Sequence, residues 1–266
     1  MEFRTIVDVT KPDFEIGACE EMLFVGSCFA DNIGRRFQEE KFRAVVNPFG
    51  VMYNPASILH TIERLSNGIQ SDFKSVFLTL GTNHVYRLKS TGEIVDNCQK
   101  RPQSLFTEEE LTIAECAEYL KRSICILRQH NPNVHVVITV SPIRYRKYGY
   151  HGSQLSKATL LLAANQIEGA SYFPAYEIVN DELRDYRFYA EDMLHPSSQA
   201  VEYIWQRFSE AYLSDEAKTF IKEWTPIKAA LNHKPFNKES EEYKAFMDKT
   251  MLKVAELRKK YPNFAL

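Results

Sequence analysis

The chain has 266 residues, of which 44% are hydrophobic and 12% aromatic, enough for a sizeable core in one large domain or two small ones. Its 33 Lys and Arg residues against 35 Asp and Glu residues give a formal net charge of −2, which argues against nucleic-acid binding. No apolar run approaches the ~20 residues needed to cross a bilayer, and residues 1–5 lack the features of a signal peptide, so we expect a cytoplasmic protein without membrane contact.

The cysteines indicate reduced thiols rather than a disulfide framework. They are odd in number, scattered, and without C-x-x-C spacing. No two histidines have the i, i+4 spacing of a zinc-binding helix. We therefore expect no metal and no cofactor.

Strand-length apolar runs alternate with helix-length amphipathic stretches along the first 95 residues. The predicted elements are strands over 22–25, 44–46 and 76–80, helices over 29–40 and 56–65, and a small hairpin over 85–95. This alternation is typical of an α/β domain with a mainly parallel sheet.

The middle of the chain continues the same pattern. Thr107 with Glu110 has the spacing of a capping box, which predicts a helix running to about Gln129. Residues 134–140 read as a buried strand, and a helix over 153–166 with a short strand at 172–173 follows. The segment 141–152 between them is aromatic and basic, and it leaves the carboxyl end of a strand, where open α/β sheets bind ligands.

From Ser198 onward the pattern is helical, interrupted by a polar break over 228–238. We expect an α/β domain over residues 1–214 and a helical C-terminal extension over 215–266. The apolar positions of the last helix are enough to dock it on the body or to pair two chains as a homo-oligomer.

Two distant segments carry residues suited to acyl transfer. Asp192 and His195 are three residues apart, and an imidazole oriented by a carboxylate can take a proton from a hydroxyl or thiol. Far upstream, an apolar strand ends at Gly26 and is followed by Ser27, Cys28 and a predicted helix, whose positive end favours an anionic nucleophile. The alternative is a helix cap beside a surface histidine.

Two further segments offer donors for an oxyanion. Gly50 ends Asn47-Pro48-Phe49-Gly50, and Asn83 ends Leu80-Gly81-Thr82-Asn83. A glycine N–H and an asparagine amide are donors of the type that stabilises a tetrahedral intermediate. Equally, Gly50 could only shape a turn, and Asn83 could only tie a loop.

In this order the four segments resemble the four blocks of the SGNH, or GDSL-like, hydrolases, and within that clan the chain resembles the GSCFA family. The motifs that carry the resemblance span about four fifths of the chain; they are 25–30, 47–50, 53–55, 97–98, 141–144, 155–158 and 186–192. The resemblance implies a three-layer α/β/α flavodoxin-like fold and metal-independent ester hydrolysis by a nucleophile, His195 and Asp192.

The nucleophile departs from the wider clan, whose turn reads Gly-Asp-Ser. Chemical type favours Ser27, whereas register from the strand favours Cys28. We favour Cys28, because a thiol is intrinsically nucleophilic and a helix N-terminus with a nearby histidine can lower its pKa. In the alternative, Cys28 is a small buried hydrophobe and Ser27 is an N-cap.

The resemblance further implies a small O-acyl ester as substrate, such as an acetyl group on a carbohydrate. Arg144 and Tyr145 in the aromatic loop, and His84 beside Asn83, are the candidate substrate-binding residues, although a solvated loop would explain them too. Two other functions stay open, namely a non-catalytic glycan-binding protein on a degenerate hydrolase fold and an O-acyltransferase.

Overall fold

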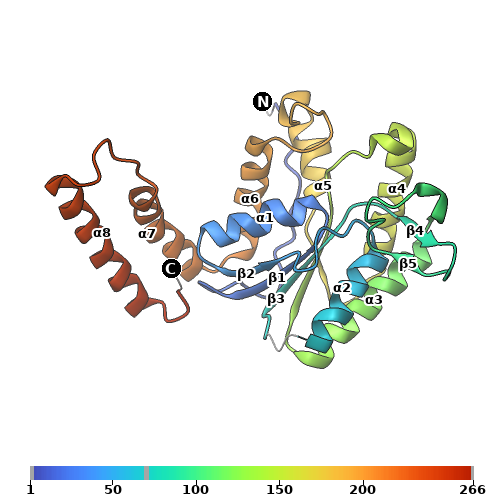
Figure 1. Ribbon diagram of the computed structural model, residues 1–266, viewed down its shortest axis with the longest axis horizontal. Coiled ribbons are helices and arrows are strands. Elements are labelled where there is room, and N and C mark those ends of the chain that lie inside the picture. Colours follow the sequence, from blue (N-terminus) through green and yellow to red (C-terminus); the bar gives the residue numbers. More distant parts are fainter. Residues whose placement is uncertain (1–2, 69–71, 265–266) are drawn as a thin grey trace.

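The computed structural model describes residues 3–68 and 72–264, and its centre is a five-stranded parallel sheet (Figure 1). The strands are β1 (Glu21–Gly26), β2 (Arg43–Val46), β3 (Ser75–Leu80), β7 (His135–Val140) and β8 (Ser171–Tyr172). They pair in the order β2-β1-β3-β7-β8, and every pairing is parallel. The chain passes from β1 to β2 on one side of β1 and then crosses to β3 on its other side, so the strand order reverses between β1 and β3.

Helices cover both faces of the sheet (Figure 1). On one face lie α1 (Cys28–Glu39) and α6 (Ser198–Tyr212), with the short α5 (Ala175–Glu177) and a π-helical turn at Ile178–Leu183. On the other lie α2 (Pro55–Gly68), α3 (Ile113–His130) and α4 (Gly149–Ala164). The predicted three-layer α/β/α flavodoxin-like architecture is confirmed.

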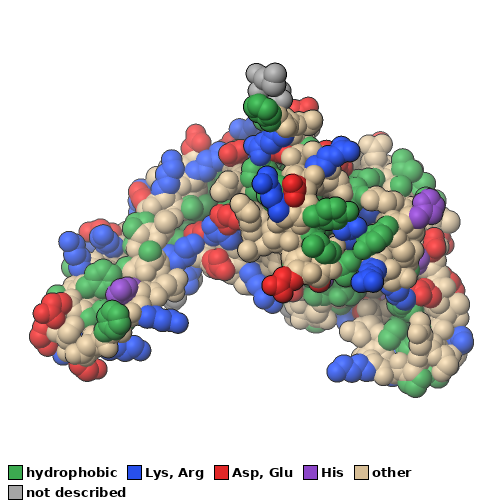
Figure 2. All heavy atoms as spheres, turned by 90° about the horizontal axis from the view of Figure 1, so that it is seen from above, with side chains coloured by type: hydrophobic (Ala, Val, Ile, Leu, Met, Phe, Trp, Pro, Cys, Tyr) green, Lys and Arg blue, Asp and Glu red, His purple; other side chains and the backbone are tan. Residues whose placement is uncertain are grey.

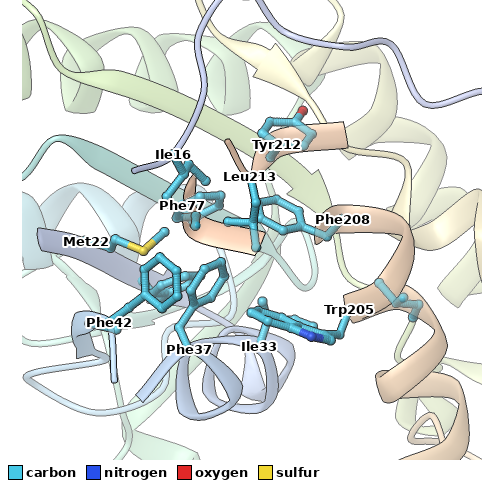
Figure 3. Close-up of a cluster of buried hydrophobic side chains, with 14 of the residues drawn as sticks. Ile16, Met22, Ile33, Phe37, Phe42, Phe77, Trp205, Phe208, Tyr212 and Leu213 are labelled. Atoms are coloured by element: carbon cyan, nitrogen blue, oxygen red, sulfur yellow. The ribbon is translucent and has the colours of Figure 1, made fainter. Parts of the chain in front are cut away.

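Aromatic side chains dominate the core between the sheet and α1 (Figure 3). Phe37 of α1 is fully buried and packs edge-on against Trp205 of α6, with ring centroids 4.5 Å apart. It also meets Phe42 and Phe208 edge-on at 5.0 and 5.7 Å. One ring therefore joins α1, α6 and the entrance to β2.

We expect Phe37→Ala to lower the free energy of unfolding by about 3–5 kcal/mol, because truncating a buried phenylalanine removes burial and leaves a cavity. Leu252→Ala is the matched control, since that apolar side chain is exposed, and it should change stability by less than about 0.5 kcal/mol. Urea unfolding of both variants measures the difference. Equal changes in the free energy of unfolding in the two variants would contradict the conclusion that Phe37 is central to the hydrophobic core.

The predicted helix start at Thr107 is wrong. Residues Phe106–Glu110 form strand β6, which pairs antiparallel with β4 (His84–Leu88), and β4 also pairs with β5 (Ile94–Val95). The capping box lies five residues later, where Thr112 accepts from Glu115 N–H and the Glu115 carboxylate accepts from Thr112 N–H. The expected hairpin is thus part of a three-stranded sheet.

Helix α4 begins at Gly149, four residues before the predicted start, so the expected substrate loop is shorter than 141–152. The sequence signal was weak there, because glycine, tyrosine and histidine are poor helix formers. Before it, residues Arg146–Tyr148 form a single 3₁₀ turn.

The C-terminal region consists of α7 (Asp215–Leu231) and α8 (Glu241–Lys260), as the helical pattern predicted. Trp224 of α7 is buried against the body and donates its indole N–H to the Glu39 carbonyl at 2.9 Å. Helix α8 packs on α7, and together they project from the body as an arm (Figure 1 and Figure 2). The domain division at residue 214 stays a prediction.

The start of the described chain is attached to the end of α6. Ile16 and Leu213 form a parallel bridge, in which Ile16 N–H donates to Tyr212 O at 2.8 Å and Ser214 N–H donates to Ile16 O at 3.0 Å.

Within the described residues, no helix has both the length and the apolar character needed to cross a membrane. On the face seen in Figure 2, Lys and Arg side chains are interspersed with Asp and Glu.

Candidate active site

The turn after β1 is built around a glycine that no other residue can replace. Gly26 has φ +140°, and a Cβ placed on it would overlap the carbonyl oxygen of Thr79 on the neighbouring strand β3. Its N–H donates to the Asn47 side-chain oxygen at 2.9 Å, and Ser27 N–H donates to Thr79 O at 3.1 Å. These bonds hold the chain tightly between β2 and β3 as it leaves the sheet.

Ser27 is the N-cap of α1. Its hydroxyl accepts from Phe29 N–H at 3.3 Å and lies 3.2 Å from the Thr79 hydroxyl. The residue is fully buried. Its oxygen is therefore used in capping and faces the protein interior.

Cys28, the first residue of α1, lies opposite the late segment predicted to contain the base. Its Sγ is 3.5 Å from Nε2 of His195, and Nδ1 of the same ring is 2.6 Å from the Asp192 carboxylate. Thiol, imidazole and carboxylate thus stand in one line of hydrogen-bond contacts, the arrangement of a nucleophile, a base and a group that orients the base.

A closed loop positions the imidazole. Ala190 N–H donates to His195 O at 2.7 Å, and the second Asp192 oxygen accepts from the N–H groups of Leu194 and His195 at 2.9 and 3.0 Å. Met193, between them, has φ +58°, a conformation that is uncommon for a non-glycine residue. Asp192 therefore orients the ring and also shapes the backbone that carries it.

The hydrogen bonds fix which nitrogen carries the proton. Backbone N–H groups of His195 and Leu194, followed by the imidazole, lower the pKa of Asp192 to about 2. An ionised carboxylate can only accept, so Nδ1 of His195 bears hydrogen and Nε2 offers its lone pair to the sulfur. Burial raises the pKa of the Cys28 thiol, so the thiol is protonated at rest and needs a base.

The two predicted oxyanion donors are engaged elsewhere. Gly50 N–H donates to Asn47 O at 2.8 Å, and the Asn83 amide donates to Leu111 O at 2.8 Å. No hydrogen bond among the described residues joins either of them to Cys28, and the bonds that they make are of the turn-shaping and loop-tying kind. Their role as oxyanion donors stays a prediction. A different donor is the backbone N–H of Cys28 at the start of α1, which lowers the pKa of the thiol, although burial raises that pKa more.

The three predicted substrate-binding residues, Arg144, Tyr145 and His84, make different kinds of contact. Arg144 donates its backbone N–H to Leu194 O and its guanidinium to Met193 O, both at 3.0 Å, so it holds the loop that carries His195. Tyr145 lies close to the sulfur, and its buried hydroxyl has no hydrogen-bond partner among the described residues. His84 stacks on Tyr148 with ring centroids 3.5 Å apart, and no hydrogen bond in the described part of the chain joins it to Cys28 or His195.

Two residues near the thiol were not predicted. Tyr53 is half-exposed, and burial followed by the nearby Cys28 charge raises its pKa. Lys157 is buried behind the turn. Lys157 falls in the motif 155–158, but a lysine in a predicted helix normally indicates a solvent-exposed face.

Across residues 3–68 and 72–264, no group of three or more His, Cys, Asp or Glu side chains could hold a metal ion.

Comparison with known proteins gives the following matches. The model of the GSCFA family matches residues 21–74 and 68–208, and that of the GSCFA domain protein C-terminal domain matches residues 224–266. No curated protein matches the chain.

Two solved structures are similar at low identity. One is a carbohydrate esterase family 3 protein from Talaromyces cellulolyticus, with 10% identity, a TM-score of 0.42, and coverage of 77% of this chain and 99% of the other. The second is a catalytic mutant of the acetylxylan esterase Axe2 from Geobacillus stearothermophilus, with 12% identity, a TM-score of 0.46, and coverage of 74% and 96%.

Proposed function

Because the chain belongs to the GSCFA family, and because its thiol, imidazole and carboxylate lie in contact, we propose that it is an ester hydrolase acting on small O-acyl groups. The observation that carries the proposal is the 3.5 Å approach of Cys28 Sγ to His195 Nε2. Cys28 is the proposed nucleophile, since the Ser27 oxygen is used in capping.

In the acylation half, His195 Nε2 takes the proton from the Cys28 thiol, and the sulfur attacks the acyl carbonyl carbon. The Cys28 N–H at the start of α1 is the proposed donor to the resulting oxyanion. The tetrahedral adduct collapses, the C–O bond breaks, and the imidazolium gives its proton to the departing alcohol oxygen. An acyl thioester and a free alcohol result.

In the deacylation half, the same imidazole removes a proton from water as the water oxygen attacks the thioester carbonyl. The C–S bond breaks, the sulfur recovers the proton from His195, and a carboxylic acid leaves. Asp192 stays ionised through both halves and stabilises the transient imidazolium.

The proposed substrate is an acyl group, such as acetyl, on a carbohydrate. Aromatic side chains are exposed around the thiol and its loop. Tyr53 is near the sulfur, while Tyr150 and Tyr186 lie against Arg144, whose guanidinium carbon is 4.3 and 5.9 Å from their ring centroids. Exposed aromatic faces pack well on the C–H surfaces of sugar rings. They support this substrate class without identifying the sugar.

The proposal is tested by trapping the acyl enzyme. We expect brief treatment with p-nitrophenyl acetate, followed by acid quench and peptide mass analysis, to place one acetyl group on the peptide containing Cys28. Neutral hydroxylamine should remove it, because it cleaves thioesters more readily than oxygen esters. An acetyl group on Ser27 that resists neutral hydroxylamine would contradict the thiol assignment.

The same experiment separates the two alternative functions. An acyl group that accumulates in water but transfers quickly to an added sugar would indicate an acyltransferase. No acylation with any ester, together with saturable binding of an oligosaccharide, would indicate a glycan-binding protein.

A further inference from the structure

Lys157 of α4 is a buried cation without a carboxylate partner among the described residues. Its side chain is only 1% exposed. Its Nζ donates to the carbonyl oxygens of Gly81 at 2.6 Å and Ser141 at 2.7 Å, and no described carboxylate forms an ion pair with it. Burying a charge is costly unless an opposite charge compensates it.

The two carbonyls place this cation beside the nucleophile turn. Gly81 directly follows β3 and Ser141 directly follows β7, so Lys157 connects two strand ends at the edge where β1 delivers Cys28. A Cβ placed on Gly81 would lie 3.4 Å from the Ser27 Cβ, which shows how closely the two turns approach. The neighbouring Ser156 fixes the same loop by accepting from Asn83 N–H at 3.0 Å.

We propose, on the basis of the function given above, that Lys157 is the electrostatic partner of the Cys28 thiolate and stabilises the sulfur anion from behind the turn. This makes Lys157 a positioning residue, since it lies behind the turn and reaches the substrate only through the sulfur. Its charge would add to that of the His195 imidazolium, which forms when His195 takes the proton from sulfur.

The direction of the coupling follows from the groups around the sulfur. Burial lowers the pKa of Lys157 to about 7, and the Cys28 anion raises it. Burial raises the pKa of the thiol most, and Asp31 and Asp192 raise it further, whereas Lys157 lowers it. Tyr53, Tyr145 and His195 also face the sulfur, and burial raises the pKa of both tyrosines, so they stay neutral near pH 7.

The coupling predicts a characteristic pH dependence of alkylation. Lys157 can stabilise the thiolate only while it is charged, so its effect should be largest below pH 7 and should fade as it loses its proton. We expect Cys28 of the unaltered protein to react with iodoacetamide about tenfold faster than Cys28 of Lys157→Met at pH 6, and at nearly the same rate by about pH 9.

Peptide mass analysis reads the two rates directly. The exposed Cys125 is an internal reference, because its rates should agree in both proteins. His195 is present in both, so the ratio of the two Cys28 rates isolates the contribution of Lys157. Lys253→Met, which removes an exposed lysine of α8, is the matched control and should leave the ratio at one across the pH range.

A purely structural role for Lys157 gives a different result. If the lysine only ties the ends of β3 and β7 together, Lys157→Met lowers the melting temperature but the rate ratio for Cys28 does not vary with pH. That outcome would overturn the proposal.

A second measurement leaves Lys157 in place, so it decides the matter even if Lys157→Met does not fold. Cys28→Asp puts a permanent anion at the position of the sulfur, and Cys28→Asn is its neutral counterpart of equal size. We expect ¹³C NMR of the lysine Cε groups to show Lys157 titrating about one pH unit higher in Cys28→Asp. Equal titration midpoints of Lys157 in the two variants would contradict the proposal.

Neither measurement uses an ester, so the two proposals fail separately. A pH-dependent rate ratio in a protein that is never acylated would retain the ion pair and remove the hydrolase. Acylation of Cys28 with a constant rate ratio would retain the hydrolase and remove the role of Lys157.

Discussion

Cys28→Ala is expected to reduce turnover of p-nitrophenyl acetate by at least about 10³-fold while leaving the fold intact. The thiol is the group in contact with the imidazole, so its removal leaves no atom that can form the acyl intermediate. Alanine fits the space, because it keeps the Cβ and only removes a half-buried sulfur at the first position of α1. Initial rates and a thermal melt on the same sample measure the two effects.

Ser27→Ala is the adjacent control, since the two side chains are neighbours in sequence but differ in role. It should destabilise the protein by about 1 kcal/mol through loss of the α1 cap, and turnover should stay within severalfold of the unaltered protein. Loss of turnover in Ser27→Ala, with Cys28→Ala active, would assign the nucleophile to the hydroxyl.

Asp192→Asn is expected to lower kcat by about 10²–10⁴-fold with a small change in KM. The carboxylate accepts at one oxygen from the imidazole and at the other from two backbone N–H groups. An amide offers one acceptor and one donor, so it cannot satisfy both and can favour the tautomer with hydrogen on Nε2. Steady-state kinetics at pH 7 to 8 measure this loss.

Asp185→Asn is the matched control. Asp185 also caps a short turn, accepting from Arg187 N–H at 2.9 Å, and no hydrogen bond or ion pair among the described residues joins it to His195. The activity of Asp185→Asn should equal that of the unaltered protein.

Because the pKa of Asp192 is about 2, its charge persists on acidification to about pH 3. An acidic limb of the pH–activity profile that vanishes in Asp192→Asn alone would therefore contradict the role assigned to Asp192.

Periodicity predicted the sheet well because each strand and helix carries its own local signal. The strands from 22–25 through 134–140 agree with the structure to within one or two residues at each end. The failure at Thr107 has a simple cause, since two Thr-x-x-Glu patterns lie five residues apart and only the second caps a helix. What makes 106–110 a strand is its pairing with β4, including the ion pair of Arg87 with Glu109, and this contact is not local.

The site was predictable where one motif carries it and not where several segments meet. The three-residue spacing of Asp192 and His195 is local, and the structure keeps them in contact. The donors Gly50 and Asn83 have the right chemistry, but Gly50 N–H bonds to Asn47 O within its own turn, and the Asn83 amide bonds to Leu111 O from a distant segment. Lys157 shows the limit most clearly, because its charge suggests solvent and only the tertiary fold buries it.

The packing of the late helix α6 on the early helix α1 has a consequence for biosynthesis. A nascent chain acquires Cys28 and α1 early, but Trp205, which covers Phe37, and the loop with His195 emerge from the ribosome much later. Until then the apolar underside of α1 is uncovered, which makes the partial chain a candidate client for chaperones. The thiol also lacks its base until then, so under the proposed mechanism an unfinished polypeptide cannot attack acyl esters.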